Sequence, residues 1–332
     1  MTTFKLGPVL LALSVIPSLP AHAETPSEVA KRYGLSGELL VAKGAKIEVH
    51  QAFGKIAPSG KAPHRIGERW RLASITKQVT AALLLRDHFN ELDTVTDTIG
   101  PLKGLTLRGL LTHHSGLANP DDSPTKAGSL PSFYLAKAPD LTICRSRAGI
   151  PNSAFSYNNC DYLLAADRYG DRVRWPSGMV MSTRGQVGVP GFVKSHREPR
   201  FNLASFGAAG GLLGTARAVL AFNQDLMNGG LLPPLACQVL WTAEGGRSYQ
   251  ALGAWVFPAK LKGCSSQKRI VQRDGEIAGV QARNFMLPDD GLSVIVFTNR
   301  FSDDFSFGEV WQQSGFAYDL LSAAACGATL GS

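Results

Sequence analysis

The sequence is most informative at residues 70–89, which read WRLASITKQVTAALLLRDHF. From Ser74 to Phe89 apolar residues occupy most sides of a helical projection, which predicts a buried helix. Ser74 and Lys77 form an S-x-x-K pattern at the head of this helix. Because residues three apart share a helix face, the lysine lies beside the serine. A buried ammonium group loses its proton easily, so this lysine can help to activate the serine as a nucleophile.

The S-x-x-K pattern is weak evidence by itself, because two more copies begin at Ser123 and Ser265. Both copies lie in polar, loop-like segments, and only Ser74 opens a long apolar helix. The pattern also fits a capping serine followed by a surface lysine. The helix therefore makes Ser74 the candidate nucleophile and leaves the capping alternative open.

The segment Tyr157-Asn158-Asn159 is the one Y-x-N in the chain. A tyrosine near an ammonium group ionises more easily and can relay the proton of a serine. The amide two residues further on, Asn159, can hold a substrate carbonyl or the lysine. The alternative is a helix start in which Asn158 or Asn159 is the cap and Tyr157 packs on the core.

The segment Arg273-Asp274-Gly275 is expected at the end of a strand. A glycine there lets a substrate backbone approach an edge strand closely. The fork of the Arg273 guanidinium suits a carboxylate, so this residue is a candidate for binding an anionic group. The alternative is an ordinary strand end before a turn.

Strand patterns lie near both ends of the chain, and helical patterns fill its middle. Strands are expected at residues 38–41, 46–53, 249–257, 269–273, 279–287 and 292–298, and helices at 27–33, 74–89, 106–113, 159–166, 215–227 and 307–325. This segregation predicts an α+β fold with an inserted helical domain. We expect residues 24–72 and 235–332 to form a discontinuous sheet domain and residues 73–234 to form the helical domain.

Residues 1–23 are expected to be a signal peptide rather than part of the fold. Lys5 precedes an apolar stretch from Leu6 to Leu19, and Ala21-His22-Ala23 is a small-x-small cleavage site. Cleavage after Ala23 predicts a periplasmic or secreted protein. No apolar stretch reaches the roughly 20 residues that a membrane-spanning helix needs.

The five cysteines all follow this leader, and an oxidising compartment permits disulfides between them. Their spacing suits the bridges Cys144–Cys160 and Cys237–Cys264, with Cys326 left over. We expect these two bridges, although sequence alone does not fix the pairing.

The formal net charge of +8 raises the question of a nucleic-acid partner. The basic stretches at 168–174, 194–200 and 260–269 contain no nucleic-acid-binding motif, so a solvated basic surface is expected instead. His113-His114 lacks a third metal ligand at suitable spacing, and the glycines at 207–211 lack the G-K-[ST] ending of a phosphate loop. We therefore expect no metal and no other cofactor.

Five segments, in the same order, resemble those of the serine β-lactamase and penicillin-binding-protein superfamily. They are WRLASITK at 70–77, LLTHHSGL at 110–117, FSYNN at 155–159, AAGGL at 208–212 and RDG at 273–275. The resemblance covers residues 37–299 and is strongest to the class C β-lactamase-related branch, which also holds esterases and D-amino-acid-specific peptidases. Five matches in order are more specific than any one of them.

The resemblance implies an antiparallel sheet flanked by terminal helices, an inserted all-helical domain, and a site in the crevice between them. Ser74 matches the acylated nucleophile, Lys77 its activating partner and Tyr157 the proton relay. Asn159 matches the amide that orients the substrate. The backbone N–H groups of Ser74 and Glu276 would form the oxyanion hole of an acyl-transfer reaction.

The third motif departs from the superfamily. Arg273 stands where lysine or histidine is usual, and a guanidinium hardly exchanges a proton. Glu276, just after this motif, adds a negative charge that can repel a substrate carboxylate or pair with Arg273. The absence of E-x-x-L-N and S-D-N segments disfavours a class A-type β-lactamase.

We expect an exported serine hydrolase that forms an acyl-enzyme with an amide or ester. The candidate substrates are a β-lactam, a D-amino-acid peptide, which includes cell-wall-derived peptides, and a small ester. The candidate residues are Ser74, Lys77 and Tyr157 for catalysis and Asn159, Arg273, Gly275 and Glu276 for substrate binding. The alternative is a non-catalytic penicillin-binding or sensor-type protein that keeps the fold.

Overall fold

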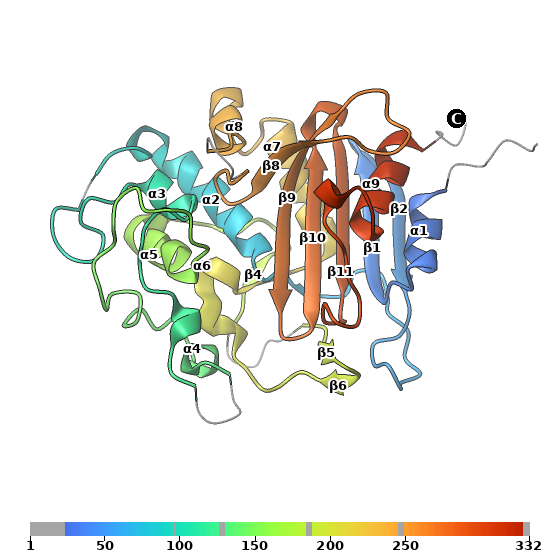
Figure 1. Ribbon diagram of the computed structural model, residues 1–332, viewed down its shortest axis with the longest axis horizontal. Coiled ribbons are helices and arrows are strands. Elements are labelled where there is room, and N and C mark those ends of the chain that lie inside the picture. Colours follow the sequence, from blue (N-terminus) through green and yellow to red (C-terminus); the bar gives the residue numbers. More distant parts are fainter. Residues whose placement is uncertain (1–23, 96, 126–129, 184–187, 245–248, 328–332) are drawn as a thin grey trace, which may run out of the picture.

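The computed structural model describes residues 24–95, 97–125, 130–183, 188–244 and 249–327 (Figure 1). The signal peptide and cleavage site expected over residues 1–23 lie outside these ranges. Within them, no helix has both the length and the apolar character needed to cross a membrane.

A six-stranded antiparallel sheet forms one side of the molecule, in the order β2-β1-β11-β10-β9-β8. Its strands are β1 (Gly37–Lys43), β2 (Lys46–Phe53), β8 (Trp255–Ala259), β9 (Lys268–Ile277), β10 (Val280–Leu287) and β11 (Leu292–Thr298). The first and last of them are neighbours, with Leu40 opposite Ile295. The α+β class and the antiparallel sheet expected from the sequence are confirmed.

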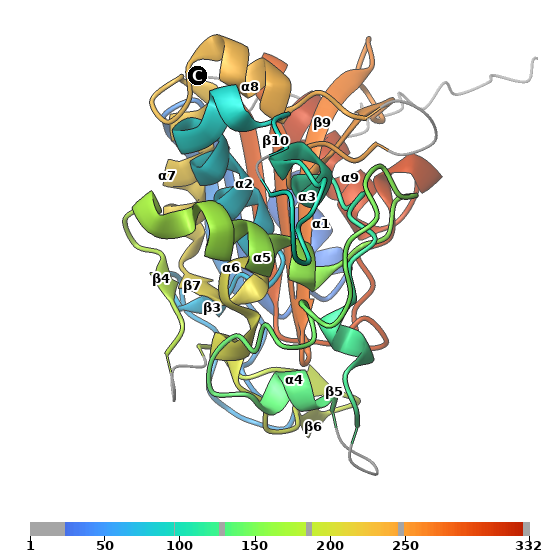
Figure 2. The ribbon, with the colours of Figure 1, turned by 90° about the vertical axis from the view of Figure 1, so that its left-hand side faces the viewer.

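Helices cover both faces of this sheet. Because side chains alternate along a strand, Leu39 and Val41 enter one core while Leu40 enters the other. On the first face lie the terminal helices α1 (Pro26–Arg32) and α9 (Phe316–Cys326), and on the second lie α2 (Ile75–His88) and α7 (Ala216–Met227). Figure 2 shows the sheet between α7 and α9.

Helix α2 is the centre of the helical side of the molecule. Every residue from Ile75 to Leu85 is buried, as its all-round apolar pattern predicts. It packs against α5 (Asn159–Tyr169) and α6 (Gly207–Gly210), and α5 packs in turn against α3 (Leu107–Leu111). The remaining α-helices and strands are α4 (Ser132–Leu135), α8 (Pro234–Leu240), β3 (Trp70–Arg71), β4 (Val180–Met181), β5 (Phe192–Val193), β6 (His196–Arg197) and β7 (Leu212–Gly214).

The strand predicted at 249–257 begins only at Trp255. Before it, the N–H of Ala251 donates to the carbonyl of Ala254 in a tight turn, where Gly253 has a φ of +75°. A Cβ on Gly253 would lie 2.8 Å from the carbonyl oxygen of Lys77. The apolar residues that suggested a strand are therefore buried as a turn packed on α2.

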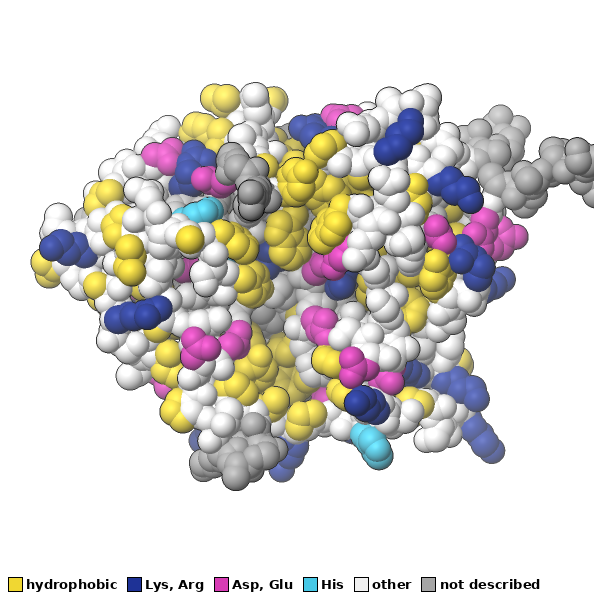
Figure 3. Space-filling view, viewed as in Figure 1, with side chains coloured by type: hydrophobic (Ala, Val, Ile, Leu, Met, Phe, Trp, Pro, Cys, Tyr) yellow, Lys and Arg dark blue, Asp and Glu magenta, His cyan; other side chains and the backbone are white. Residues whose placement is uncertain are grey.

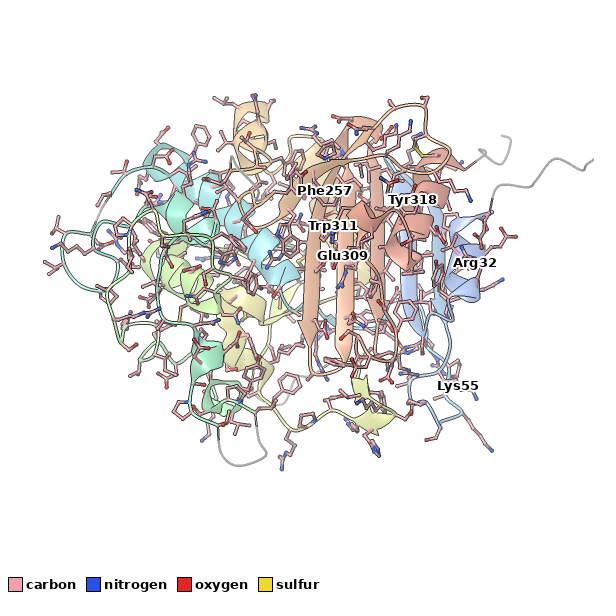
Figure 4. The ribbon with its side chains drawn as sticks, in the orientation of Figure 1. Arg32, Lys55, Phe257, Glu309, Trp311 and Tyr318 are labelled. Carbon is pink, nitrogen blue, oxygen red and sulfur yellow. A yellow bond between two sulfur atoms is a disulfide. The ribbon has the colours of Figure 1, made fainter. Side chains whose placement is uncertain are left out.

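The helix predicted at 307–325 begins only at Phe316. Two glycines with positive φ, Gly308 (+65°) and Gly315 (+92°), prevent a continuous helix before this residue. Phe307 and Phe316 pack edge to face, and Trp311 packs in the same way on Phe257 of β8 (Figure 4). Aromatic side chains that pack in a non-helical segment give the same apolar pattern as the face of a helix. The sequence pattern therefore predicted a helix where there is none.

Two disulfides join the chain, and one of the expected pairs is wrong. Cys144–Cys160 is confirmed. Cys264 is bonded to Cys326 rather than to Cys237, which is free and buried. Cys237 lies in α8 in the core on the second face of the sheet, whereas Cys264 and Cys326 pack against the core under α9. The sheet therefore separates the two cysteines that the spacing had paired.

We expect the unfolded, non-reduced protein to react with one equivalent of N-ethylmaleimide, at Cys237, and the reduced protein with five. Replacing both members of Cys144–Cys160 by alanine should lower the free energy of unfolding by about 3 kcal/mol, and replacing both members of Cys264–Cys326 should lower it by about 4 kcal/mol, in the chain-entropy model. Mass spectrometry and urea titration measure both effects. Three or more reactive thiols without reductant would contradict the pairing.

Candidate active site

Ser74 lies at the turn that joins β3 to α2. The preceding residue, Ala73, has a φ of +45°, a strained conformation for a residue with a side chain. Ser74 occupies the cap position of α2, but its hydroxyl makes no capping hydrogen bond. Instead the Ser74 Oγ lies 2.6 Å from Tyr157 Oη and 3.3 Å from Lys77 Nζ. The capping alternative therefore does not describe this serine.

Lys77 is fully buried one turn along the helix. Its Nζ donates to Asn159 Oδ1 at 2.6 Å and to the carbonyl oxygen of Ala209 at 2.8 Å, besides Ser74. Burial lowers the pKa of Lys77 and outweighs the opposing attraction of Tyr157. The lysine can therefore give up a proton more easily than a lysine in water.

Tyr157 links the lysine to the third motif. Its Oη, besides contacting Ser74, accepts a hydrogen bond of 2.9 Å from Arg273 Nη2. Burial alone would raise the pKa of Tyr157, but the positive charges of Lys77 and Arg273 outweigh burial and lower it. A phenolate is thus easier to form here than in solution. Asn158, the next residue, does cap α5, as the helix-start alternative supposed.

Arg273 is fully buried and points into the site from β9. Its Nε donates to the carbonyl oxygen of Ser74 at 3.0 Å, and its guanidinium lies 4.9 Å from the ring of Trp255. Only Nη1 has no hydrogen-bond partner in the part of the chain that the structure describes. The Arg273 guanidinium, which was expected to hold a carboxylate, is thus mostly engaged with Ser74 and Tyr157.

The third motif lies inside β9, which continues to Ile277, and does not end the strand as predicted. A Cβ on Gly275 would lie 2.4 Å from the carbonyl oxygen of Leu72, so this glycine lets the strand approach the turn that carries Ser74. Strand β8 pairs with β9 only as far as Gln272, which leaves residues 273–277 unpaired on that side among the described strands. No described strand therefore covers this edge of β9.

Glu276 has an exposed side chain on the same stretch. Arg273 and Glu276 do not pair, because Arg273 points inward to Tyr157. The surface is hollowed between the helical side and the sheet, with acidic side chains on both sides of the hollow (Figure 3). Arg273 therefore does not neutralise Glu276, whose carboxyl has a pKa raised by desolvation.

The other two S-x-x-K serines lie in different surroundings. Ser123 is buried, and its hydroxyl accepts the N–H of Phe133. Ser265 is exposed, and its partner in the motif, Lys268, forms an ion pair with Asp290. Within the described ranges, neither serine has a lysine and a tyrosine at its hydroxyl.

Three residues near the site were missed by sequence reasoning: His113 and Asp161, which are buried, and Asp121, which is partly buried. Asp121 accepts a hydrogen bond from Asn159 Nδ2 at 3.1 Å, and His113 contacts Asp161 at 2.7 Å. The LLTHHSGL segment was the available signal for His113, whereas nothing in the sequence placed Asp161 beside it. Among the described residues, no three His, Cys, Asp or Glu side chains gather as metal ligands would.

Comparisons with known proteins agree with this geometry. A family model described as Beta-lactamase matches residues 27–168, which include Ser74, Lys77 and Tyr157. Penicillin-binding protein 4* of Bacillus subtilis (strain 168) is 27% identical over 157 residues, which make up 44% of this chain and 34% of that protein. Both matches support the resemblance of this chain to the β-lactamase and penicillin-binding-protein superfamily.

Solved structures of this superfamily share the fold. A penicillin-binding protein from Bacillus halodurans superimposes with a TM-score of 0.65 at 19% identity, over 90% of this chain and 98% of that one. A D-amino acid amidase from Ochrobactrum anthropi SV3, complexed with L-phenylalanine amide, superimposes with a TM-score of 0.64 at 18% identity, over 89% and 95% of the two chains. The β-lactamase and penicillin-binding-protein superfamily includes serine hydrolases of this architecture.

Proposed function

We propose that this protein is a serine hydrolase that forms an acyl-enzyme on Ser74 with an amide or ester substrate. The observation that carries the proposal is the convergence of three groups: Ser74 Oγ lies 2.6 Å from Tyr157 Oη and 3.3 Å from Lys77 Nζ. Both neighbours of the Ser74 hydroxyl have lowered pKa values, so each loses its own proton more readily than in water and can then accept the proton of Ser74.

In the proposed reaction, Ser74 Oγ attacks the substrate carbonyl while its proton passes to Tyr157 or Lys77. The same proton then goes to the leaving amine or alcohol as the carbon–leaving-group bond breaks. Water next attacks the acyl-enzyme and gives a proton to Tyr157 or Lys77. The bond between the acyl carbon and Ser74 Oγ then breaks, Ser74 takes that proton back, and the acid is released. Asn159 holds Lys77 in place and can orient the substrate.

The oxyanion hole would consist of the N–H groups of Ser74 and Glu276. A two-residue turn, in which Ala278 and Gly279 both have positive φ, joins β9 to β10 and makes Ile277 and Val280 a hydrogen-bonded pair. Because hydrogen-bonding direction alternates along a strand, the N–H of Glu276 then points to the unpaired edge. That orientation supports its proposed role.

The proposed substrates are those that the sequence suggested: a β-lactam, a D-amino-acid peptide or amide, or a small ester. The rival proposal is a penicillin-binding or sensor-type protein that is acylated without turnover. We also propose export after cleavage at Ala23, which the two disulfides support, because disulfides persist in oxidising compartments.

Stopped-flow kinetics with p-nitrophenyl acetate, nitrocefin and D-phenylalanine amide, together with labelling by a fluorophosphonate, test the proposal. We expect covalent labelling and repeated turnover of at least one substrate. A single stoichiometric burst without turnover would favour the sensor alternative, and the absence of labelling and of any turnover would refute the hydrolase.

The pH dependence of the reaction should depend on Arg273. If the Tyr157 phenolate takes the serine proton, kcat/KM rises as the pH passes the pKa of Tyr157. Arg273→Gln removes a positive charge beside the phenolate, so it raises this pKa and moves the acid limb of the profile to higher pH. Arg283→Gln is the control, because Arg283 pairs with Asp274 at 3.1 Å instead. An unchanged acid limb in Arg273→Gln would show that Tyr157 is not the titrating base.

A further inference from the structure

His113 holds the segment that carries Tyr157 at two points. The N–H of Ser156 donates to the carbonyl oxygen of His113 at 3.0 Å, and the N–H of Asn158 donates to His113 Nδ1 at 3.3 Å. Between these bonds the imidazole lies against the phenol ring, with 4.7 Å between the ring centroids. One residue therefore contacts the positions before and after Tyr157 and the tyrosine itself.

The backbone of His113 is fixed in an unusual conformation. Its φ is +64°, in the left-handed region that residues with side chains rarely occupy, and it follows the last turn of α3. The residue is buried, and its Nε2 has no hydrogen-bond partner among the described residues. Strain and an unpaired polar atom both cost stability, so they point to a role other than filling space.

Asp161 fixes the orientation of the imidazole. Its Oδ2 lies 2.7 Å from His113 Nδ1, and its Oδ1 accepts a hydrogen bond from the Ser115 hydroxyl. Both side chains are fully buried, and burial raises the pKa of Asp161 and lowers the pKa of His113. The Nδ1 nitrogen faces both Asp161 Oδ2 and the N–H of Asn158, so the contact with Asp161 fixes the rotation of the ring that brings Nδ1 to Asn158.

We propose that His113 is a positioning residue for Tyr157, and that Asp161 holds it in the orientation this task requires. Through the two backbone bonds, His113 sets where the phenol hydroxyl lies relative to Ser74 and Lys77. Its effect on rate rests on the proposed hydrolase function, whereas its effect on the order of residues 156–158 does not.

Three variants separate this role from general packing. His113→Asn keeps a polar atom at the position of Nδ1, and asparagine tolerates the left-handed conformation. His113→Gln carries the same amide as asparagine on a side chain that is one carbon longer, so the acceptor for the N–H of Asn158 is lost. His114→Gln is the matched control, because His114 Nδ1 contacts only the hydroxyl of Thr112, at 3.1 Å, among hydrogen-bond partners of its ring.

The test combines amide hydrogen exchange of peptides covering residues 154–160 with single-turnover acylation. In His113→Gln we expect exchange at Ser156 and Asn158 to be faster by about tenfold or more, since each bond that protects them is weakened. Acylation should slow by about tenfold or more, with KM within about threefold, because a misplaced proton acceptor affects chemistry more than binding. His113→Asn and His114→Gln should stay within about threefold of wild type in exchange and acylation.

Wild-type exchange and acylation in His113→Gln would overturn the inference. So would equal losses in the Asn and Gln variants with a common fall in melting temperature, since His113 would then serve packing alone. If wild type itself is not acylated, the proposed function fails, while the exchange comparison still decides whether His113 orders the Tyr157 segment.

Discussion

Ser74→Ala is expected to abolish covalent labelling and to lower turnover by at least about 10⁴-fold, as removal of a serine nucleophile does in other hydrolases. The change deletes one oxygen, and the hydroxyl makes no bond that caps α2, so the fold should be unaffected. Titration with a fluorophosphonate, followed by intact mass, measures the covalent step directly. Steady-state kinetics measure the turnover that remains.

Ser265→Ala is the matched control for this variant. Ser265 belongs to the same S-x-x-K pattern, but it is exposed and lies before β9 rather than at the head of α2. We expect wild-type labelling and turnover in Ser265→Ala. Labelling that persists in Ser74→Ala, or that disappears in Ser265→Ala, would assign the nucleophile elsewhere.

Lys77→Met should lower the acylation rate by about 10²- to 10⁴-fold, because the serine loses an adjacent proton acceptor. Methionine has a similar length but no amine, so Asn159 Oδ1 and the Ala209 carbonyl lose their donor. Those lost bonds are offset by the removal of a buried ionisable group, so the melting temperature should change little. A large rate loss with a small stability change is the result that identifies a catalytic lysine.

Lys268→Met is the control for Lys77→Met, because Lys268 holds the same place in the Ser265 pattern and pairs with Asp290 near the surface. It should retain wild-type kinetics. If Lys77→Met also keeps its acylation rate, Tyr157 alone serves as the proton acceptor, and the proposed partnership of Lys77 with Ser74 is wrong.

Local patterns predicted most of the fold. The apolar residues of 74–89 give a helix buried on all sides, and Thr215 caps α7 as its sequence predicts. The secondary-structure predictions failed where the buried residues follow no regular spacing, as in the turn at Gly253 and the aromatic segment before Phe316. There the residues satisfy packing between distant elements, which a local pattern cannot describe.

The candidate site was predictable where its residues share one element. Ser74 and Lys77 lie on one helix face, so their spacing alone brings them together. The direction of Arg273 was not predictable, because it depends on how β9 lies against the turn before α2. The contact of His113 with Asp161 joins α5 to the end of α3, and no spacing in the sequence encodes it.

The pairing of β1 with β11 has a consequence for how the molecule assembles. Strands from opposite ends of the chain are neighbours at the centre of the sheet, so contact order is high and closure of the sheet is slow. During synthesis, the edge of β1 that pairs with β11 stays unpaired until almost the whole polypeptide has emerged from the ribosome. A chain that ends before Leu292 would keep that edge exposed, and we expect it to aggregate in sedimentation assays rather than fold. Hence the sheet on which α2 packs, with the proposed nucleophile Ser74 at its head, is completed only when β11 has been made.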